Sequence, residues 1–264
     1  MSNVRKYKYT YSTYANSVGA LLDEPLKAFL SETPSAALPV MGGLISQTKE
    51  DIRFNVASTE ILRVGRASST VFGEVRGEGE NKHFLSMASS TVENLNILDV
   101  ITADAIVSKV TSVSPATPAR EEEANSNCHR ARFYTGGSHF DNLKINGTPY
   151  NFAANPDFSD RNGFPIGTAG VRREHLFIAC PKVIDCPKKD FVSALLPSPT
   201  GKRWVTAPDE SDGCIYIPQF GSIHFGEVVI YGSKIILTML RVELGCQTSG
   251  YVTAGTSSTN GIDA

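Results

Sequence analysis

Long apolar runs and a large charge excess are both missing from this sequence of 264 residues. Its 25 Lys and Arg residues nearly balance 27 Asp and Glu residues, so no long-range field attracts a polyanion, and nucleic acid is not an expected partner. The most apolar stretch, Ile235 to Leu240, is far shorter than the roughly 20 residues of a membrane span. No apolar run follows the charged N-terminal residues, so we expect neither a signal peptide nor a membrane span.

The sequence also lacks the short motifs that carry common chemistries. It has no His-Glu-x-x-His, no Cys-x-x-Cys pair, no Gly-x-Ser-x-Gly and no phosphate-binding loop. We therefore expect no enzyme, no catalytic residue, no metal and no cofactor. Two other hypotheses stay open: a small hydrolase that uses Cys128 or a histidine, and a metal site of His139, Asp141 and His224 if their strands meet.

Cysteine is scarce, and the five cysteines all lie at or beyond residue 128. An odd number leaves at least one of them without a partner in the same chain. Cys180 and Cys186 bracket a short segment, and the pattern fits either a disulfide between them or two buried thiols.

The residues that are abundant favour β-structure. Serine and threonine number 46 and valine 20, a balance that suits short strands and polar turns better than helices. One short helix is expected over residues 17–31, where apolar residues approximate helical spacing. Alternating polar and apolar residues predict strands over residues 4–14, 51–56, 69–75, 83–88, 102–113, 214–218, 222–228 and 234–244.

Two local patterns refine the expected fold. Asn146-Gly147 between two short alternating segments predicts a tight hairpin. Residues 90–97 and 138–145 share the pattern Ser-x-(Val/Phe)-acidic-Asn-Leu-x-Ile, with a bend or register shift predicted at each Asn-Leu step. Hairpins and long alternations favour an antiparallel β-sandwich, and the repeat leaves a β-solenoid as the alternative.

The chain is expected to form a single β-rich domain over residues 1–264. Residues 157–212, where the alternation is lost, are interpreted as an insertion, and residues 250–264 as a flexible tail. If the protein is a ligand-binding or toxin-like module, Trp204, Arg203 and Tyr216 would form its recognition surface, with a glycan among the ligands considered.

Three stretches resemble the choice-of-anchor P family of exported surface proteins. They are residues 88–106 with Thr-Ala-Asp-Ala, residues 142–149 with Asn-Gly-Thr-Pro, and residues 215–227 with Ile-Pro-Gln-Phe-Gly. The similarity spans residues 60–256 in the same order. It implies a non-enzymatic β-rich domain that is secreted or at the cell surface, with a cytoplasmic location as the alternative.

The many predicted strands, together with the lack of a recognisable set of catalytic residues, favour a structural or surface-interaction protein. Such a protein acts by self-association or by binding a protein partner, and exposed strand edges are a natural route to either.

Overall fold

The computed structural model describes residues 9–24, 26–116, 131–150, 152–154, 164–165, 171–178, 214–217, 220–231, 234–245 and 249–260. These residues are mostly β-strand, and their single helical element is the 3-10 turn η1 (Gly79–Asn81). Within this described part of the chain, no helix has the length and apolar character needed to cross a membrane. The all-β prediction is confirmed.

Two antiparallel sheets form the fold, as predicted for a sandwich rather than a solenoid. Sheet A has the order β13 (Val171–His175), β16 (Gly221–Tyr231), β17 (Lys234–Leu244), β18 (Ser249–Asn260), β1 (Tyr14–Glu24) and β2 (Ala28–Ala37), with β15 (Cys214–Ile217) also beside β16. Sheet B has the order β10 (Thr148–Pro149), β9 (Lys144–Ile145), β6 (Ile101–Pro115), β5 (His83–Ile97), β4 (Thr59–Arg76) and β3 (Gly43–Val56).

Five short strands complete the architecture. In sheet B, β7 (Arg132–Tyr134) and β8 (His139–Asp141) pair with β6, and β12 (Phe164–Pro165) pairs with β7. A separate pair is formed by β11 (Ala153–Ala154) and β14 (Phe177–Ile178).

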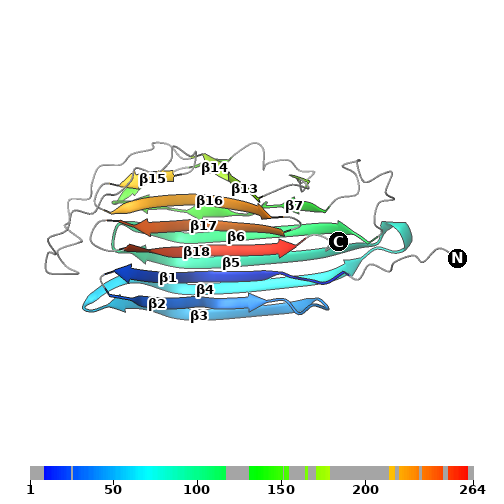
Figure 1. The fold of residues 1–264 in the computed structure, drawn as a ribbon, viewed down its shortest axis with the longest axis horizontal. Coiled ribbons are helices and arrows are strands. Elements are labelled where there is room, and N and C mark those ends of the chain that lie inside the picture. The colour runs from blue at the N-terminus through cyan, green and yellow to red at the C-terminus, as the bar shows by residue number, and fades with distance from the viewer. Residues whose placement is uncertain are drawn as a thin grey trace.

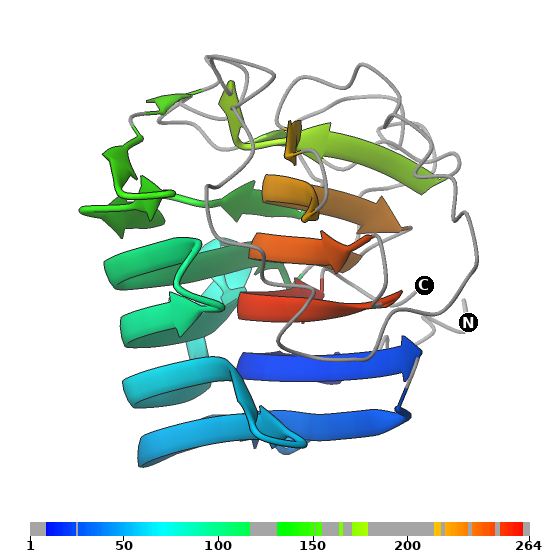
Figure 2. The ribbon, with the colours of Figure 1, turned by 90° about the vertical axis from the view of Figure 1, so that its left-hand side faces the viewer.

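The two sheets lie face to face with their strands nearly aligned. Figure 1 looks through sheet A onto sheet B, and Figure 2 shows the sheets edge-on as two stacks, with β2 and β3 together at one end. The chain crosses from sheet A to sheet B at this end, through the connection between β2 and β3. The first and last strands, β1 and β18, are neighbours inside sheet A.

The helix expected over residues 17–31 is wrong, because this segment forms β1 and β2. Strand β1 pairs with β18 on one side and β2 on the other, and it turns Val18, Ala20 and Leu22 into the core. This two-residue alternation is not evident from the sequence, because Leu21 is apolar as well as Leu22. Together with Val18, these two leucines also fit the i, i+3, i+4 spacing of a helix. Tertiary pairing decides the local structure here.

The flexible tail expected over residues 250–264 is also wrong for residues 250–260. They belong to β18, which is paired on both sides and buries Val252, Ala254 and Ser257. The Gly, Ser and Thr residues that suggested mobility are the small side chains that a tightly packed central strand requires. Residues 261–264 lie outside the described residues.

The strand expected over residues 4–14 begins only at Tyr14. Residues 1–8 lie outside the described part of the chain, and residues 9–13 have no regular structure. Tyr9 stacks on Phe84 with ring centroids 4.1 Å apart, and Tyr11 meets the same ring edge-on at 6.4 Å. Tyr9 and Tyr11 therefore both lie against sheet B.

The repeated pattern marks two segments that flank the same strand in the same register. Val92 of β5 and Phe140 of β8 both pair with Ile106 of β6, one on each side. The predicted irregularity is confirmed, since Asn94 and Asn142 have φ of 54° and 47° and neither joins the ladders with β6. Asparagine tolerates this left-handed conformation better than most residues.

Asn94 and Gly65 form a row across two strands of sheet B, and at this row the alternation of inward-pointing side chains moves by one residue. The ladder between β4 and β5 omits the pair Gly65 and Asn94; Val64 is buried before this row and Ala67 after it. The same shift occurs in sheet A beside Gly255, which has φ of 69°. The row divides the space between the sheets into two halves.

One half of the interior is aliphatic, and the other contains many buried hydroxyl groups. Single serine side chains bridge the sheets there: Ser257 donates to the Ser108 carbonyl at 3.2 Å, and Ser69 donates to the Pro34 carbonyl at 2.7 Å. Because a serine side chain is short, the facing backbones are closer than the roughly 10 Å usual for stacked sheets. Fully buried hydroxyl residues of this half are Ser69, Ser86, Ser90, Ser108, Ser112, Ser114, Ser257 and Thr259.

The hairpin predicted at Asn146-Gly147 is confirmed. It joins β9 to β10, and both turn residues have positive φ, 50° and 77°. Three short strands, β12, β13 and β14, lie within the expected insertion at 157–212, and β13 extends sheet A beside β16. The status of this segment as an insertion stays a prediction.

Candidate functional site

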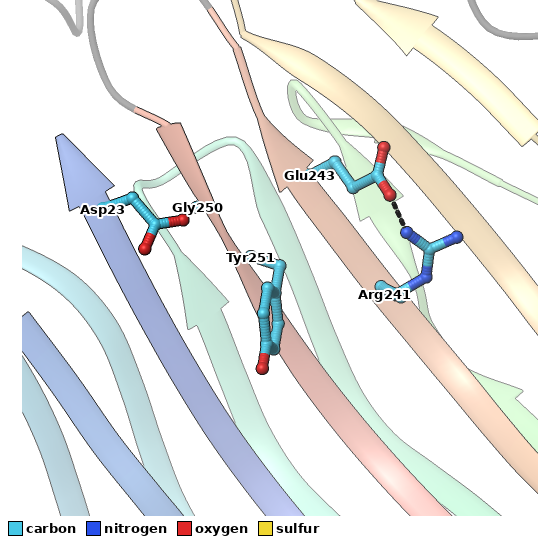
Figure 3. A pocket seen from close by; sticks show the side chains of 5 residues that line it. All are labelled: Asp23, Arg241, Glu243, Gly250 and Tyr251. Carbon is cyan, nitrogen blue, oxygen red and sulfur yellow. Dashed lines mark hydrogen bonds and ion pairs between the residues drawn. The ribbon is translucent and has the colours of Figure 1, made fainter.

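A hollow of about 470 Å³ lies on the outer face of sheet A, at the end where β1 and β17 finish. Figure 3 shows the Tyr251 ring between Asp23 of β1 on one side and the Arg241–Glu243 pair of β17 on the other. The described residues that line the hollow are Asp23, Arg241, Glu243, Gly250 and Tyr251.

Strand register brings these residues together although they are far apart in the sequence. Tyr251 lies directly opposite Glu243 in the β17–β18 ladder and directly opposite Leu21 in the β1–β18 ladder. Arg241 and Glu243 are two residues apart, so they project from the same face of β17. Directly opposite side chains in an antiparallel ladder have Cβ atoms about 5 Å apart, which places the ring and the carboxylate side by side.

Arg241 links the hollow to a second carboxylate. Its Nε and Nη2 atoms donate to the two carboxylate oxygens of Glu227, each at 2.6 Å, and its Nη1 atom donates to Glu243. This bidentate geometry is the strong form of an arginine–carboxylate pair. The side chains of Arg241 and Glu227 are about three-quarters buried or more, so the pair is partly shielded from solvent screening.

A cysteine and a histidine lie next to these ion pairs, on strands β15 and β16. Cys214 and His224 are opposite each other in the β15–β16 ladder, with Sγ and Nε2 3.9 Å apart, and both residues are buried. His224 lies between two carboxylates, 3.9 Å from Glu227 and 3.6 Å from Glu243. His224 is therefore buried among charged side chains.

The Cys214 thiol is not an activated nucleophile. Burial raises its pKa to about 11; the nearby Arg241 opposes this shift and Glu227 adds to it. At neutral pH the sulfur is therefore protonated, whereas catalytic cysteines need a lowered pKa. The Cys214–His224 pair therefore does not supply a thiolate nucleophile.

A second surface feature lies on the edge strands β2 and β3, one in each sheet, which lie at the same end of the sandwich. Of seven large hydrophobic side chains that are exposed among the described residues, six lie along β2, along β3, in the connections beside them or on the adjacent β4. The most exposed are Met41 at 80%, Phe29 at 73% and Leu44 at 66%. The six residues, called the apolar edge below, are Leu26, Phe29, Val40, Met41, Leu44 and Val75.

The recognition surface predicted from the sequence can be followed at one residue only. Tyr216 lies in β15 opposite Ser222 and is partly exposed. Trp204 and Arg203 lie outside the described residues, as do Cys180 and Cys186 of the predicted disulfide. These expectations stay predictions.

The alternative metal site is not assembled. His139 and Asp141 are exposed on β8 of sheet B with side chains 3.4 Å apart, whereas His224 lies on β16 of sheet A. Across the described residues, no group of three or more His, Cys, Asp or Glu side chains could hold a metal ion. Cys128, the other candidate nucleophile, is outside the described part of the chain.

Sequence reasoning missed the residues of the hollow. Arg241 and Glu243 are two charged residues near the end of a largely apolar strand, which was the one available signal. Tyr251 fell in the expected tail and Asp23 in the expected helix, so both wrong structural predictions removed residues of the site from consideration.

Comparison with known proteins places the chain in a family without an assigned role. The model of the family described as "Domain of unknown function (DUF8256)" matches residues 9–175, so the protein belongs to that family. The match ends at the last residue of β13, and β15 to β18 lie beyond it. No curated protein and no solved structure matches the chain. The resemblance to choice-of-anchor P proteins stays a prediction.

Proposed function

We propose that this protein is a non-enzymatic interaction domain that works by self-association through the apolar edge. The observation that carries the proposal is the concentration of six of the seven exposed large hydrophobic side chains of the described residues on this edge. Scattered exposed hydrophobics are ordinary on a soluble protein, but these six gather at the two ends of one edge: Leu26 and Phe29 at one end, and Val40, Met41, Leu44 and Val75 at the other.

The backbone of β3 supports the same proposal. Among the described strands, β3 pairs with β4 on one side and ends sheet B on the other, so one row of its peptide groups has no partner among them. Its segment from Gly43 to Glu50 contains no proline, whereas β2, the edge of sheet A, carries Pro34 at its centre and lacks one donor there. Strand addition is therefore favoured at β3.

A second copy of the chain fits this edge without opposing like charges. An antiparallel pair centred on Thr48 places Gln47 opposite Lys49 of the other copy and Ser46 opposite Glu50. Lys49 donates to Thr33 at 3.5 Å, which puts the middles of β2 and β3 at one level. The Leu44 end of one copy then meets the Phe29 end of the other, so exposed apolar side chains cover each other.

The test is sedimentation equilibrium of the 28.5 kDa chain over a range of concentrations. The wild type should form dimers, and Leu44→Ser or Phe29→Ser should weaken the dimer about tenfold or more, because burial of a large apolar side chain contributes about 1.5–3 kcal/mol. Thr48→Lys places a charge opposite itself at the twofold axis and should also weaken it. Thr148→Lys, at the opposite edge of sheet B, is the matched control and should leave it unchanged.

Two results would contradict the proposal. A wild type that stays monomeric at every concentration removes self-association altogether. A dimer that is unaffected by all three edge substitutions shows that another surface associates.

A further inference from the structure

We propose that the hollow on the outer face of sheet A binds a basic side chain of a peptide, a lysine ammonium or an arginine guanidinium group. The proposal goes beyond the association of the apolar edge and concerns a different surface. It rests on the exposed Tyr251 ring, on the carboxylates around it and on the occupied donors of Arg241.

The charges of the hollow favour a cation. Asp23 and Glu243 line the hollow, and Glu227 pairs with Arg241 beside it, so three carboxylates outnumber the single guanidinium group of Arg241. An anionic ligand would therefore be repelled, and a cation would enter a region of negative potential. Asp23 of β1 and Glu243 of β17 stand on opposite sides of the Tyr251 ring, a spread that suits an organic cation better than a compact metal ion.

The hydrogen-bonding capacity left over in the hollow consists mainly of acceptors. Arg241 directs three of its five N–H donors, from Nε, Nη1 and Nη2, at Glu227 and Glu243, so two donors remain for a ligand. The carboxylate of Asp23 has no partner among the described residues, and it is exposed. A ligand that brings its own N–H donors satisfies these acceptors, which a lysine or arginine head group does.

The aromatic ring supplies the remaining contact. Tyr251 is 43% exposed, and Figure 3 shows its ring standing free between Asp23 and Arg241. A cation within about 6 Å of the centre of a tyrosine ring is attracted by the ring's quadrupole. The aliphatic stem of a basic side chain can lie along the ring and the adjacent Leu21, while its charge meets the carboxylates.

The experiment is an NMR titration of the ¹⁵N-labelled full chain with N-acetyl-lysine methylamide and with N-acetyl-arginine methylamide. N-acetyl-norleucine methylamide, which has an uncharged side chain, is the control ligand. The proposal predicts saturable shifts of amide signals at 241–243 and 250–252 with at least one basic probe and none with norleucine. Added salt should weaken the binding, because it screens partly exposed charges.

Protein variants separate the contributions. Asp23→Asn should raise the dissociation constant about threefold to tenfold, and Tyr251→Leu about twofold to fivefold, in line with cation–π contacts at exposed sites. Tyr251→Phe keeps the ring and should bind as the wild type does. Asp99→Asn, an exposed carboxylate of the β5–β6 turn, is the matched control.

The proposal is overturned if neither basic probe binds, if norleucine binds equally well, or if Asp23→Asn and Tyr251→Leu both leave the dissociation constant unchanged. None of these results bears on the apolar edge, and a monomeric wild type would leave this titration fully interpretable.

Discussion

Replacing Ser17 should show how close the two sheets are in the half of the interior that contains the buried serines. Ser17 is buried on β1, and its hydroxyl is 2.9 Å from the Ser68 carbonyl, 2.9 Å from the Ser69 hydroxyl and 3.1 Å from the Ser90 hydroxyl. One side chain of sheet A therefore joins two strands of sheet B, β4 and β5.

Two substitutions separate hydrogen bonding from space. Ser17→Ala removes the hydroxyl and leaves the buried Ser90 hydroxyl without this acceptor, which should lower the free energy of unfolding by about 2 kcal/mol. Ser17→Val loses the same bonds and also forces methyl groups between closely spaced backbones, which should add about 1–3 kcal/mol to the loss. The valine variant should therefore be the less stable of the two.

The assay is urea unfolding followed by far-ultraviolet circular dichroism. Ser46→Ala serves as the control, because its hydroxyl also bonds a neighbour, Thr70 at 2.9 Å, but on an exposed surface. Its free energy of unfolding should change by less than about 0.5 kcal/mol. If Ser17→Val is as stable as the wild type, the sheets have room for larger side chains and the reasoning is refuted.

Three further predictions concern backbone, packing and pH. Gly73→Ala should lower the free energy of unfolding by about 1–3 kcal/mol, because the added Cβ would lie 2.5 Å from a Leu38 methyl group. Gly136→Ala is the control and should be neutral, because no atom lies within 4 Å of its added Cβ. Equal thermal midpoints of the two variants would contradict this prediction. Asn94→Ala should cost about 1 kcal/mol at φ of 54°, and Asn94→Gly should be tolerated in the same melting assay. The pKa of the Cys214 thiol is raised from 9.0 to about 11, so the contribution of the protonated thiol to the free energy of unfolding is complete below pH 9 and is lost as the pH rises through 11. Between these pH values, urea titrations should show that Cys214→Ala loses about 1–2 kcal/mol less stability than the wild type. Parallel pH profiles of the two proteins would contradict this prediction.

Strand positions and turns were predictable where the local pattern and the tertiary structure agree. The alternation over residues 234–244 matches β17 at both ends, and Asn146-Gly147 forms the expected hairpin. The repeat at residues 90–97 and 138–145 correctly marked two irregular strands, because an asparagine with positive φ has a recognisable sequence context. That both segments flank β6 could not be inferred from their similarity alone.

The candidate site was beyond local patterns because long-range pairing builds it. Asp23 and Tyr251 are 228 residues apart in the sequence, and only the pairing of β1 with β18 brings them to one surface. The apolar edge was hidden for a related reason. Phe29 fits the core face of a helix as well as the exposed edge of a sheet, and only the position of β2 at the edge decides between them.

Hydrogen exchange at low and high protein concentration tests the central claim, association through the apolar edge, most directly. The account predicts that backbone amides of residues 43–50 exchange more slowly at high concentration, because strand addition pairs the outward peptide groups of β3. Amides of residues 139–149, at the other end of sheet B, should exchange at the same rate under both conditions. Identical exchange at residues 43–50 at both concentrations, or slowing confined to other strands, would contradict it.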